Sequence, residues 1–252
     1  MQLFDSHCHF NDQKFDNDRD IIIQKIHADG VQNATCAGYN VKSSIEAIEI
    51  ATKYDFIYAT CGISPNDIED IDRVDEIEKL LDNKKVVAVG EIGLDYYWNK
   101  DNKEKQKQLF INQIDLANKH NLPIQIHTRD ASIDTISILK EHPVINKGIF
   151  HCCPLNQELI KEGVKLGFYI SFSGNITFKN AKSYECVKLV PLNQLLIETD
   201  SPYLCPEPYR GKRNDPSFVK YVANKISEIH NISVDEIANI TYENACKIFK
   251  IK

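Results

Sequence analysis

Eight short apolar runs, separated by stretches with helical periodicity, recur along this chain of 252 residues. Strands that alternate with helices indicate a parallel sheet, because neighbouring parallel strands must be joined by a crossover, usually a helix. Eight such repeats are the number that closes a TIM (β/α)8 barrel, and one barrel domain routinely has this length. The predicted strands are Leu3–His9, Asn33–Ala37, Ile57–Ile63, Val86–Ile92, Ile124–His127, Gly148–Cys152, Tyr169–Ser173 and Leu195–Thr199.

The stretches between these strands predict helices, and no linker rich in glycine or proline interrupts them. We therefore expect residues 1–252 to form a single domain, with two further helices in residues 216–251 packed on the outside. An open, doubly wound sheet is the alternative, since it has the same order of elements. The predicted helices between strands are Arg19–Ala28, Ser43–Lys53, Val74–Leu81, Glu104–His120, Ala131–Glu141 and Gln157–Leu166.

The overall charge limits the kinds of partner that the chain can have. Its formal net charge is −6 at pH 7, which argues against a protein that coats duplex DNA regardless of sequence. No apolar run is long enough to cross a bilayer, and the N-terminus lacks a basic segment followed by an apolar one. The eight cysteines include no Cys-x-x-Cys pair, so we expect reduced thiols. We expect a cytoplasmic protein with no membrane partner and no obligate protein partner.

Histidine and carboxylate residues follow the predicted strands. His7 and His9 end the first strand, and their spacing of two places both imidazoles on one face. The other candidates lie at the ends of four further strands, and the carboxyl ends of barrel strands converge on one face of the molecule. Each residue alone could be a polar cap or an ion-pair partner, but five strand ends carrying such residues indicate a metal site. These further candidates are Glu91, His127, His151 and Asp200.

Four imidazoles and two carboxylates are more ligands than one tetrahedral zinc with an open position needs. They suit two divalent ions that share a carboxylate and a water. Glu91 is the better candidate for the shared ligand, because it follows Val89-Gly90 and its carboxylate can approach the barrel axis. Asp200 is expected to bind one ion and to face the shared water.

Sequence blocks along nearly the whole chain resemble the TatD family of metal-dependent deoxyribonucleases, within the wider amidohydrolase-like barrels. The resemblance implies that His7, His9 and Asp200 hold one metal, that His127 and His151 hold the other, and that Glu91 bridges them. It also implies hydrolysis of DNA from the 3′ end, usually of single strands, with magnesium or manganese activating water; four histidines keep zinc possible. The matching blocks are Phe4–His9, Glu91–Trp98, His127–Ala131, His151–Cys152, Glu198–Leu204, Arg210–Asn214 and Asn244–Phe249.

One block departs from the family pattern. Where the family commonly has Gly-x-His-Pro-His, this chain has Gly62-Ile63-Ser64-Pro65-Asn66. The first of the two missing histidines usually lies close to the substrate phosphate in that family. Ser64 can still donate a hydrogen bond there, but it carries no positive charge. The replacement puts the rate and the preferred substrate in question, not the metal site.

Aromatic and basic residues close to the same strand ends are candidates for holding a substrate. Tyr96 and Trp98 follow Glu91, and bases stack on aromatic faces in proteins that bind single strands. Arg129, Arg210 and Arg213 can grip phosphates through paired hydrogen bonds. The alternatives are rings that only pack the loop onto the barrel, and a solvated run of charges.

The residues together favour a metal-dependent nuclease, and the resemblance implies a 3′–5′ exonuclease on single-stranded DNA. Glu91 and Asp200 are the candidate catalytic residues, with Asp200 accepting a proton as water attacks phosphorus. A metal-dependent hydrolase of a small ester, lactone or amide on the same barrel is the second hypothesis, and a non-catalytic binding protein is the third. The sequence leaves open whether DNA or RNA is the physiological substrate, which metal is native, and the oligomeric state.

Overall fold

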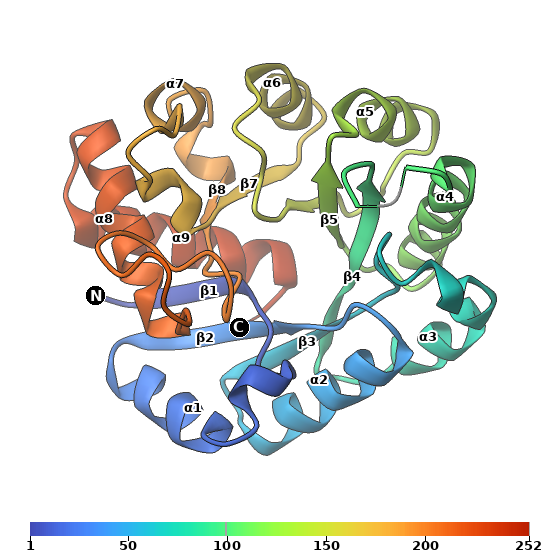
Figure 1. The fold of residues 1–252 in the computed structure, drawn as a ribbon, viewed down its shortest axis with the longest axis horizontal. Coiled ribbons are helices and arrows are strands. Elements are labelled where there is room, and N and C mark those ends of the chain that lie inside the picture. Colours follow the sequence, from blue (N-terminus) through green and yellow to red (C-terminus); the bar gives the residue numbers. More distant parts are fainter. Residues whose placement is uncertain (99, 252) are drawn as a thin grey trace.

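The computed structural model describes residues 1–98 and 100–251. Within these residues, eight parallel strands pair in chain order and helices surround them, as Figure 1 shows. The predicted (β/α)8 barrel is thereby confirmed. The strands are β1 (Leu3–Cys8), β2 (Val31–Ala37), β3 (Ile57–Cys61), β4 (Val86–Asp95), β5 (Ile124–Arg129), β6 (Gly148–Phe150), β7 (Tyr169–Phe172) and β8 (Leu195–Ile197).

The helices form the outer layer of the barrel (Figure 1). Because they cover the outside of the sheet, most strand residues are buried, and β4 is buried along its whole length. This explains why the sequence shows continuous apolar runs rather than alternation. The helices are α1 (Arg19–Ala28), α2 (Val41–Lys53), α3 (Val74–Leu80), α4 (Lys103–Lys119), α5 (Ser132–Glu141), α6 (Gln157–Lys165), α7 (Ser183–Val187), α8 (Val219–His230) and α9 (Val234–Phe249).

Strand β4 is longer than the sequence predicts. It runs to Asp95 rather than Ile92, so Glu91 lies inside the strand and not at its end. Its pairing with β5 shifts register between Val89 and Ile92, then continues past the shift. The continuation depends on Gly93, which has φ +136° and whose added Cβ would lie 2.0 Å from the carbonyl oxygen of His127. A residue with a side chain cannot occupy this position without moving β5.

Side chains contribute to the seam between the first and last strands. The Asp5 carboxylate accepts a hydrogen bond of 2.9 Å from the amide of Thr199, and the Ser6 hydroxyl donates one of 2.9 Å to the carbonyl of Ile197. Beyond β8, the amide of Asp200 donates to the carbonyl of His7 over 2.9 Å. Two of the predicted metal ligands are therefore tied together through the backbone.

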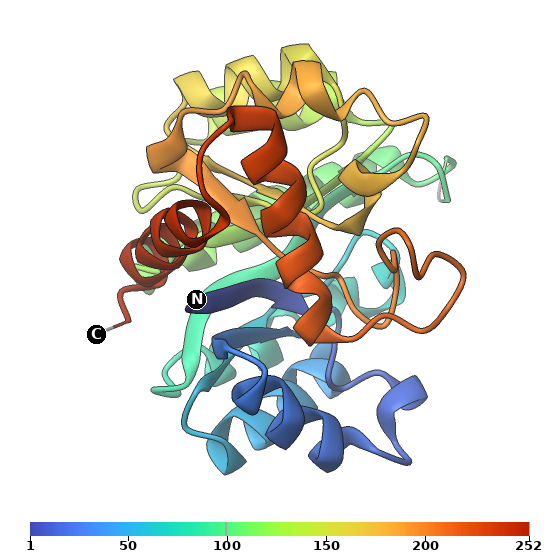
Figure 2. The same cartoon turned by 90° about the vertical axis from the view of Figure 1, so that its left-hand side faces the viewer.

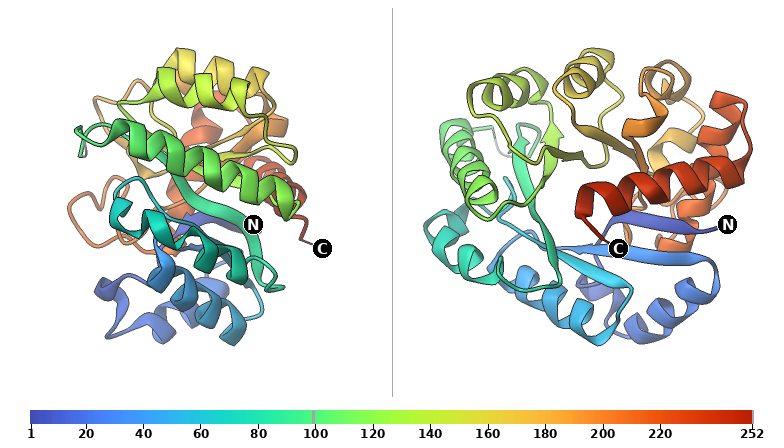
Figure 3. Two further views of the ribbon diagram at one scale, coloured as in Figure 1. Left: turned by 90° about the vertical axis from the view of Figure 1, so that its right-hand side faces the viewer. Right: turned by 180° about the vertical axis from the view of Figure 1, so that it is seen from behind.

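The two C-terminal helices occupy different places. Figure 2 shows α8 along the outside of the barrel, whereas the right-hand view of Figure 3 shows α9 across the end that carries both termini. There Phe249 of α9 stacks on Phe4 of β1, with 5.7 Å between ring centroids, in a cluster that includes Leu196. Helix α9 thus covers the amino-terminal end of the strands, which leaves the carboxyl-terminal end for the site. Within the described ranges, none of the helices combines the length and apolar character that a bilayer crossing requires.

Candidate metal centre

The six predicted ligand residues lie together, Glu91 from within β4 and the others at or just beyond the carboxyl ends of their strands. His7 comes from β1, Glu91 from β4 and His127 from β5, whereas the others lie one to three residues beyond the ends of β1, β6 and β8. Their side chains are largely buried; those of His127 and Asp200 keep 20% and 15% of their surface exposed. The centre is therefore sheltered but still open to a small ligand. The three residues that follow strands are His9, His151 and Asp200.

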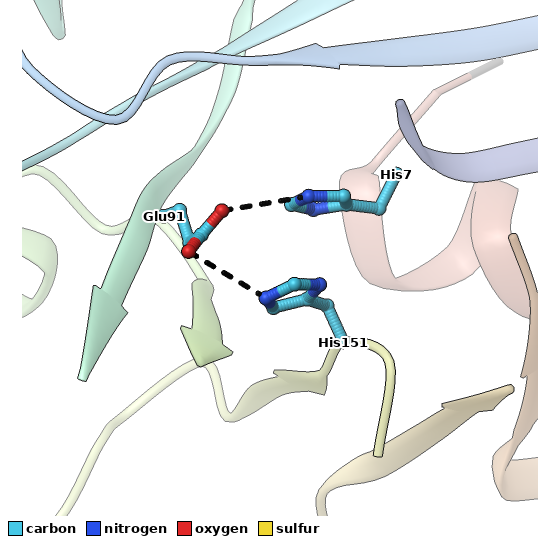
Figure 4. A group of neighbouring side chains, drawn as sticks. All are labelled: His7, Glu91 and His151. Atoms are coloured by element: carbon cyan, nitrogen blue, oxygen red, sulfur yellow. Dashed lines mark ion pairs between the residues drawn. The ribbon is translucent and has the colours of Figure 1, made fainter. Parts of the chain in front are cut away.

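Glu91 lies between two groups of histidines. Its Oε2 atom is 3.6 Å from His7 Nε2 and 3.8 Å from His9 Nε2. Its Oε1 atom is 3.3 Å from His127 Nδ1 and 3.8 Å from His151 Nε2. Figure 4 shows the carboxylate directed toward His7 on one side and His151 on the other. One carboxylate thus presents a different oxygen to each pair of imidazoles.

Asp200 completes the group around His7 and His9. Its Oδ1 atom is 3.6 Å from His7 Nε2 and 3.4 Å from His9 Nε2, and the two imidazole nitrogens are 3.1 Å apart. These three residues could hold one metal ion, since one atom of each lies within 4.8 Å of the others. His127 Nδ1 and His151 Nε2 are 3.2 Å apart, and one atom each of His7, Glu91 and His151 also lie within 4.8 Å of one another.

The other nitrogen of each histidine faces an acceptor from the protein. His7 Nδ1 is 2.9 Å from the side-chain oxygen of Gln125, and His9 Nδ1 is 3.2 Å from the carbonyl of Ala37. His127 Nε2 is 3.0 Å from Asp95 Oδ2. His151 Nδ1 lies 3.5 Å from Glu198 Oε1 without a hydrogen bond to it, and Glu198 Oε1 accepts the amide of Cys152. Such acceptors fix the ring orientation and tautomer of metal-binding histidines.

Sequence reasoning assigned no role to the side chains behind the ligands. Gln125 is a buried amide between two isoleucines of β5, and Glu198 is a buried acid that follows β8. In the sequence, Asp95 stands out only as part of the block Glu91–Trp98, which matches the family. For Gln125, the sequence signal is a polar residue between two apolar ones in a strand, because a buried polar side chain needs a hydrogen-bond partner.

The surroundings shift the pKa values of His7 and His151 in opposite directions. Burial, together with neighbouring His151 and His9, lowers the pKa of His7 well below its usual value. Burial acts in the same direction on His151, but the charges of Glu91 and Glu198 outweigh it and raise its pKa to about 9. Burial would also raise the pKa of Asp95, yet hydrogen bonds from His127 and from two backbone amides lower it to about 2.

The donor set fits divalent metal ions. Imidazole nitrogens and carboxylate oxygens converge from several strands, and the outward nitrogens already face acceptors. Four nitrogens without an ion between them would be an unfavourable arrangement, because they offer lone pairs or like charges to one another. The cluster therefore has the composition of a metal centre.

The aromatic residues after Glu91 divide into two kinds. Tyr96 is buried, and its hydroxyl donates a 2.7 Å hydrogen bond to Asp134. Tyr97 and Trp98 are exposed by 46% and 65% and pack edge to face, with the Arg129 guanidinium 3.9 Å from the Tyr97 ring centroid. The placement of Tyr96 is that of loop packing and argues against the predicted stacking role. The other two rings, together with Arg129, form an exposed surface.

The basic residues after Asp200 have partners within the protein. Arg213 donates to both carboxylate oxygens of Asp18, over 2.9 and 2.5 Å, and to the carbonyl of Lys14. Its guanidinium would have to give up these bonds to grip a phosphate, so the structure disfavours the predicted role. Arg210 lies 4.2 Å from the ring centroid of Phe178.

Ser64 lies in a cavity that also borders Glu91 and His9. The cavity has a volume of about 210 Å³ and also contacts Tyr39 and Tyr203. Its hydroxyl donates to Asp67 over 2.9 Å, so a carboxylate stands close to a place that the family usually gives to a histidine. This side of the centre is polar without being basic.

Comparison with known proteins places the chain in a family. A family model described as TatD related DNase matches residues 4–250. The chain belongs to this family. The uncharacterized metal-dependent hydrolase YabD of Bacillus subtilis is 47% identical over 253 residues, which cover 99% of both chains. The uncharacterized metal-dependent hydrolase YcfH of Escherichia coli K12 is 36% identical over 256 residues, covering 100% of this chain and 97% of the relative. The TatD-type resemblance is therefore confirmed, in a family of metal-dependent hydrolases.

Solved structures agree with the TatD assignment. YJJV, a TatD homolog from Escherichia coli K12, superposes with a TM-score of 0.94 at 28% identity, over 99% of this chain and 98% of its own. A TatD family hydrolase from Entamoeba histolytica gives a TM-score of 0.90 at 25% identity, over 100% of this chain and 99% of its own. An organophosphorus hydrolase from Deinococcus radiodurans has a TM-score of 0.68 at 13% identity, over 98% of this chain and 92% of its own, and shares the fold alone.

Proposed function

We propose that this protein is a metal-dependent nuclease, and that it removes nucleotides from the 3′ end of single-stranded DNA. The observation that carries the proposal is the Glu91 carboxylate, whose two oxygens face two separate pairs of imidazoles. Two ions sharing one carboxylate are a common arrangement for phosphodiester hydrolysis. The proposed cofactors are two magnesium or manganese ions, with zinc as the alternative.

The protein residues around the centre have distinct tasks in this proposal. His7, His9 and Asp200 hold one ion, His127 and His151 hold the other, and Glu91 is shared. When bound, the ions make water a better nucleophile and offset the charge that develops on the phosphate.

Asp200 is the proposed proton acceptor. Its side chain is more exposed than that of Glu91, at 15% against 9%, so a water can reach it from the open face. Its amide is held by the carbonyl of His7, which keeps its carboxylate close to the histidines of β1. A carboxylate fixed beside the attacking water can take its proton as the bond to phosphorus forms.

The exposed rings of Tyr97 and Trp98 are the proposed base-binding surface. The Arg129 guanidinium covers one face of the Tyr97 ring, and Trp98 packs edge to face on Tyr97 with 65% of its surface exposed, so a positive charge lies beside an open aromatic ring. Bases stack on such surfaces without sequence preference, and a guanidinium can contact the neighbouring phosphate.

Hydrolysis of a small ester, lactone or amide is the second candidate function. The observation that favours it is the cavity beside the centre, where Ser64 donates to Asp67 and Asp12 adds a second carboxylate. A cavity of about 210 Å³ with acidic walls suits a small neutral molecule better than an anionic strand.

The experiment that tests the proposed function is cleavage of a 5′-labelled single-stranded oligonucleotide in magnesium, manganese or EDTA. Glu91→Ala is the control, since it removes the shared ligand. We expect a ladder that shortens from the 3′ end, depends on metal and disappears in the variant. Internal cuts under the same controls would leave a nuclease but refute exonuclease action. No cleavage by protein that holds its metal would favour the small-molecule hydrolase.

A further inference from the structure

Asp95 connects one side of the metal centre to the exposed aromatic surface. Its Oδ2 atom is 3.0 Å from His127 Nε2, and its Oδ1 atom accepts the amides of Tyr97 and Trp98 over 2.9 and 3.0 Å. One carboxylate therefore holds a predicted ligand with one oxygen and the backbone of the aromatic loop with the other.

The position of Asp95 is itself fixed by α4. The side chain of Gln106 accepts the amide of Asp95 over 2.8 Å and donates to its carbonyl over 3.0 Å. Asp95 is fully buried at the end of β4. A shift of His127 is therefore passed to the loop through this carboxylate, because its surroundings leave it little freedom to absorb the movement.

The contact also decides which nitrogen of His127 faces the centre. If Nε2 donates its proton to Asp95, the lone pair is on Nδ1, which lies 3.3 Å from Glu91 and 3.2 Å from His151. The ring is then oriented for an ion between His127 and His151. The histidines of the other position, His7 and His9, are held by Gln125 and by the carbonyl of Ala37 instead.

We propose that Asp95 is a positioning residue that couples ion binding at His127 and His151 to the conformation of the loop that carries Tyr97 and Trp98. An ion held by His7, His9 and Asp200 has no such direct connection among the contacts of the described residues. The inference rests on the proposed function to the extent that divalent ions bind here. Since coupling is reciprocal, a single strand stacked on the loop changes the affinity for the ion at His127 by the same factor as that ion changes the affinity for the strand.

Trp98 makes the coupling measurable, because it is the only tryptophan in the chain. We would titrate the metal-free protein with Mn²⁺ and follow both the heat of binding and the Trp98 fluorescence. The expected result is two binding events, with the fluorescence following only one of them. That event should be absent in His127→Ala, while the other event remains.

The matched pair of variants is Asp95→Asn and Asp134→Asn. Asp134 also supports the loop, through the Tyr96 hydroxyl, but it touches none of the six ligands. We expect Asp95→Asn to weaken the fluorescence-linked event by about 10–100-fold and to leave the other event unchanged. Asp134→Asn should bind both ions with native affinity.

The possible results separate the two proposals. If the native protein bound no Mn²⁺, the proposed function would fail, and this inference with it. Two binding events without a fluorescence change, or native affinities in Asp95→Asn, would overturn the inference alone. If Asp95→Asn does not fold, the comparison of the native protein with His127→Ala still tests the coupling. Trp98 fluorescence that follows the one binding event left in His127→Ala would refute it.

Discussion

Neighbouring residues of similar type have different roles in this protein because of the partners that each side chain meets. Tyr96 and Trp98 are two positions apart, yet one ring is buried against Asp134 and the other is mostly exposed beside Arg129. Arg213 is paired with Asp18, whereas Arg129 lies over the exposed rings. Residue type alone does not distinguish these cases.

Replacing Trp98 tests the stacking surface. We expect Trp98→Ala to raise the KM for a single-stranded oligonucleotide by about 5–150-fold, since stacking contributes about 1–3 kcal/mol per base. Tyr96→Phe is the control, because it loses only the bond to Asp134 and should leave KM unchanged. Steady-state kinetics on both variants measure this, and an unchanged KM in Trp98→Ala would exclude stacking there.

Position 64 tests the departure from the family pattern. Ser64→His would place an imidazole in the cavity beside Glu91 and next to Asp67, and when it is protonated it can donate a charged hydrogen bond to a phosphate. A hydrogen bond to a charged group contributes about 1.5–3 kcal/mol, so we expect kcat/KM on DNA to rise by about 10–100-fold. Ser64→Ala serves as the control, and equal rates for the histidine and alanine variants would show that position 64 does not meet the phosphate.

The pair formed by Arg213 and Asp18 predicts a pH dependence of stability. The hydrogen bond from Arg213 lowers the pKa of Asp18 below its ordinary value. A carboxyl group with a lowered pKa stabilises the fold above its unfolded pKa of about 3.9 and loses that effect as the pH falls through the folded value. The difference in Tm between native protein and Arg213→Ala should therefore be constant from about pH 5 to 8 and shrink below about pH 4.

Arg210→Ala is the comparison for this pair, since Arg210 lies over the Phe178 ring. The difference in Tm between native protein and Arg210→Ala should not shrink in this way at low pH. The structural role also predicts that Arg213→Ala leaves the KM for oligonucleotides and its salt dependence unchanged. A weaker salt dependence in that variant would restore the phosphate-binding role expected from the sequence.

Among the elements, β4 and β5 do the most to shape the centre. The register shift between Val89 and Ile92 allows β4 to continue to Asp95, so Glu91 and Asp95 come from one strand. Gly93 lies between them, where β4 approaches the backbone of His127. The shared carboxylate and the support of His127 thus depend on one close contact between strands.

Gly93→Ala tests this contact. Its new Cβ would overlap the carbonyl oxygen of His127 at 2.0 Å, so we expect a loss of about 3–5 kcal/mol in the free energy of unfolding. Gly211→Ala is the matched control, because Gly211 also has a positive φ, +88°, but meets nothing within 4 Å. It should lose only about 1–2 kcal/mol. Urea denaturation measures both, and equal losses would contradict the role of the close contact.

At the scale of the whole molecule, the centre joins strands from around the barrel. The candidate ligands come from β1, β4 and β5 and from residues one to three positions beyond the ends of β1, β6 and β8. Helix α9 covers the opposite end, where Phe249 packs on Phe4. An ion bound at the centre therefore links parts of the fold that are far apart in sequence.

Metal binding is accordingly expected to stabilise the whole barrel. An ion at 100 times its Kd adds about 2.7 kcal/mol per site if the unfolded chain does not bind it. Tm should rise with Mn²⁺ and fall in EDTA, and the rise should be reduced in Glu91→Gln, which weakens the shared ligand. Calorimetric scans at several Mn²⁺ concentrations measure this, and a Tm independent of metal would contradict a centre that links the strands.

The sequence by itself determined the barrel and the meeting of the candidate ligands on one side of it. Eight buried strands require continuous apolar runs, and a polar ligand such as His7 or His127 stands out at the end of such a run. The carboxyl ends of barrel strands must converge, so a ligand's place along its own strand is enough to predict that it joins the group.

The tertiary structure alone decided which side chains hold each candidate ligand, and which aromatic and basic residues near the site are paired within the protein. Gln125 behind His7, Asp95 behind His127 and Glu198 beside His151 are contacts between different strands or their ends. The partners of Arg213 and Tyr96 come from other segments in the same way. These contacts depend on strand register and loop path, which are set by packing across the whole molecule and not by the local run of residues.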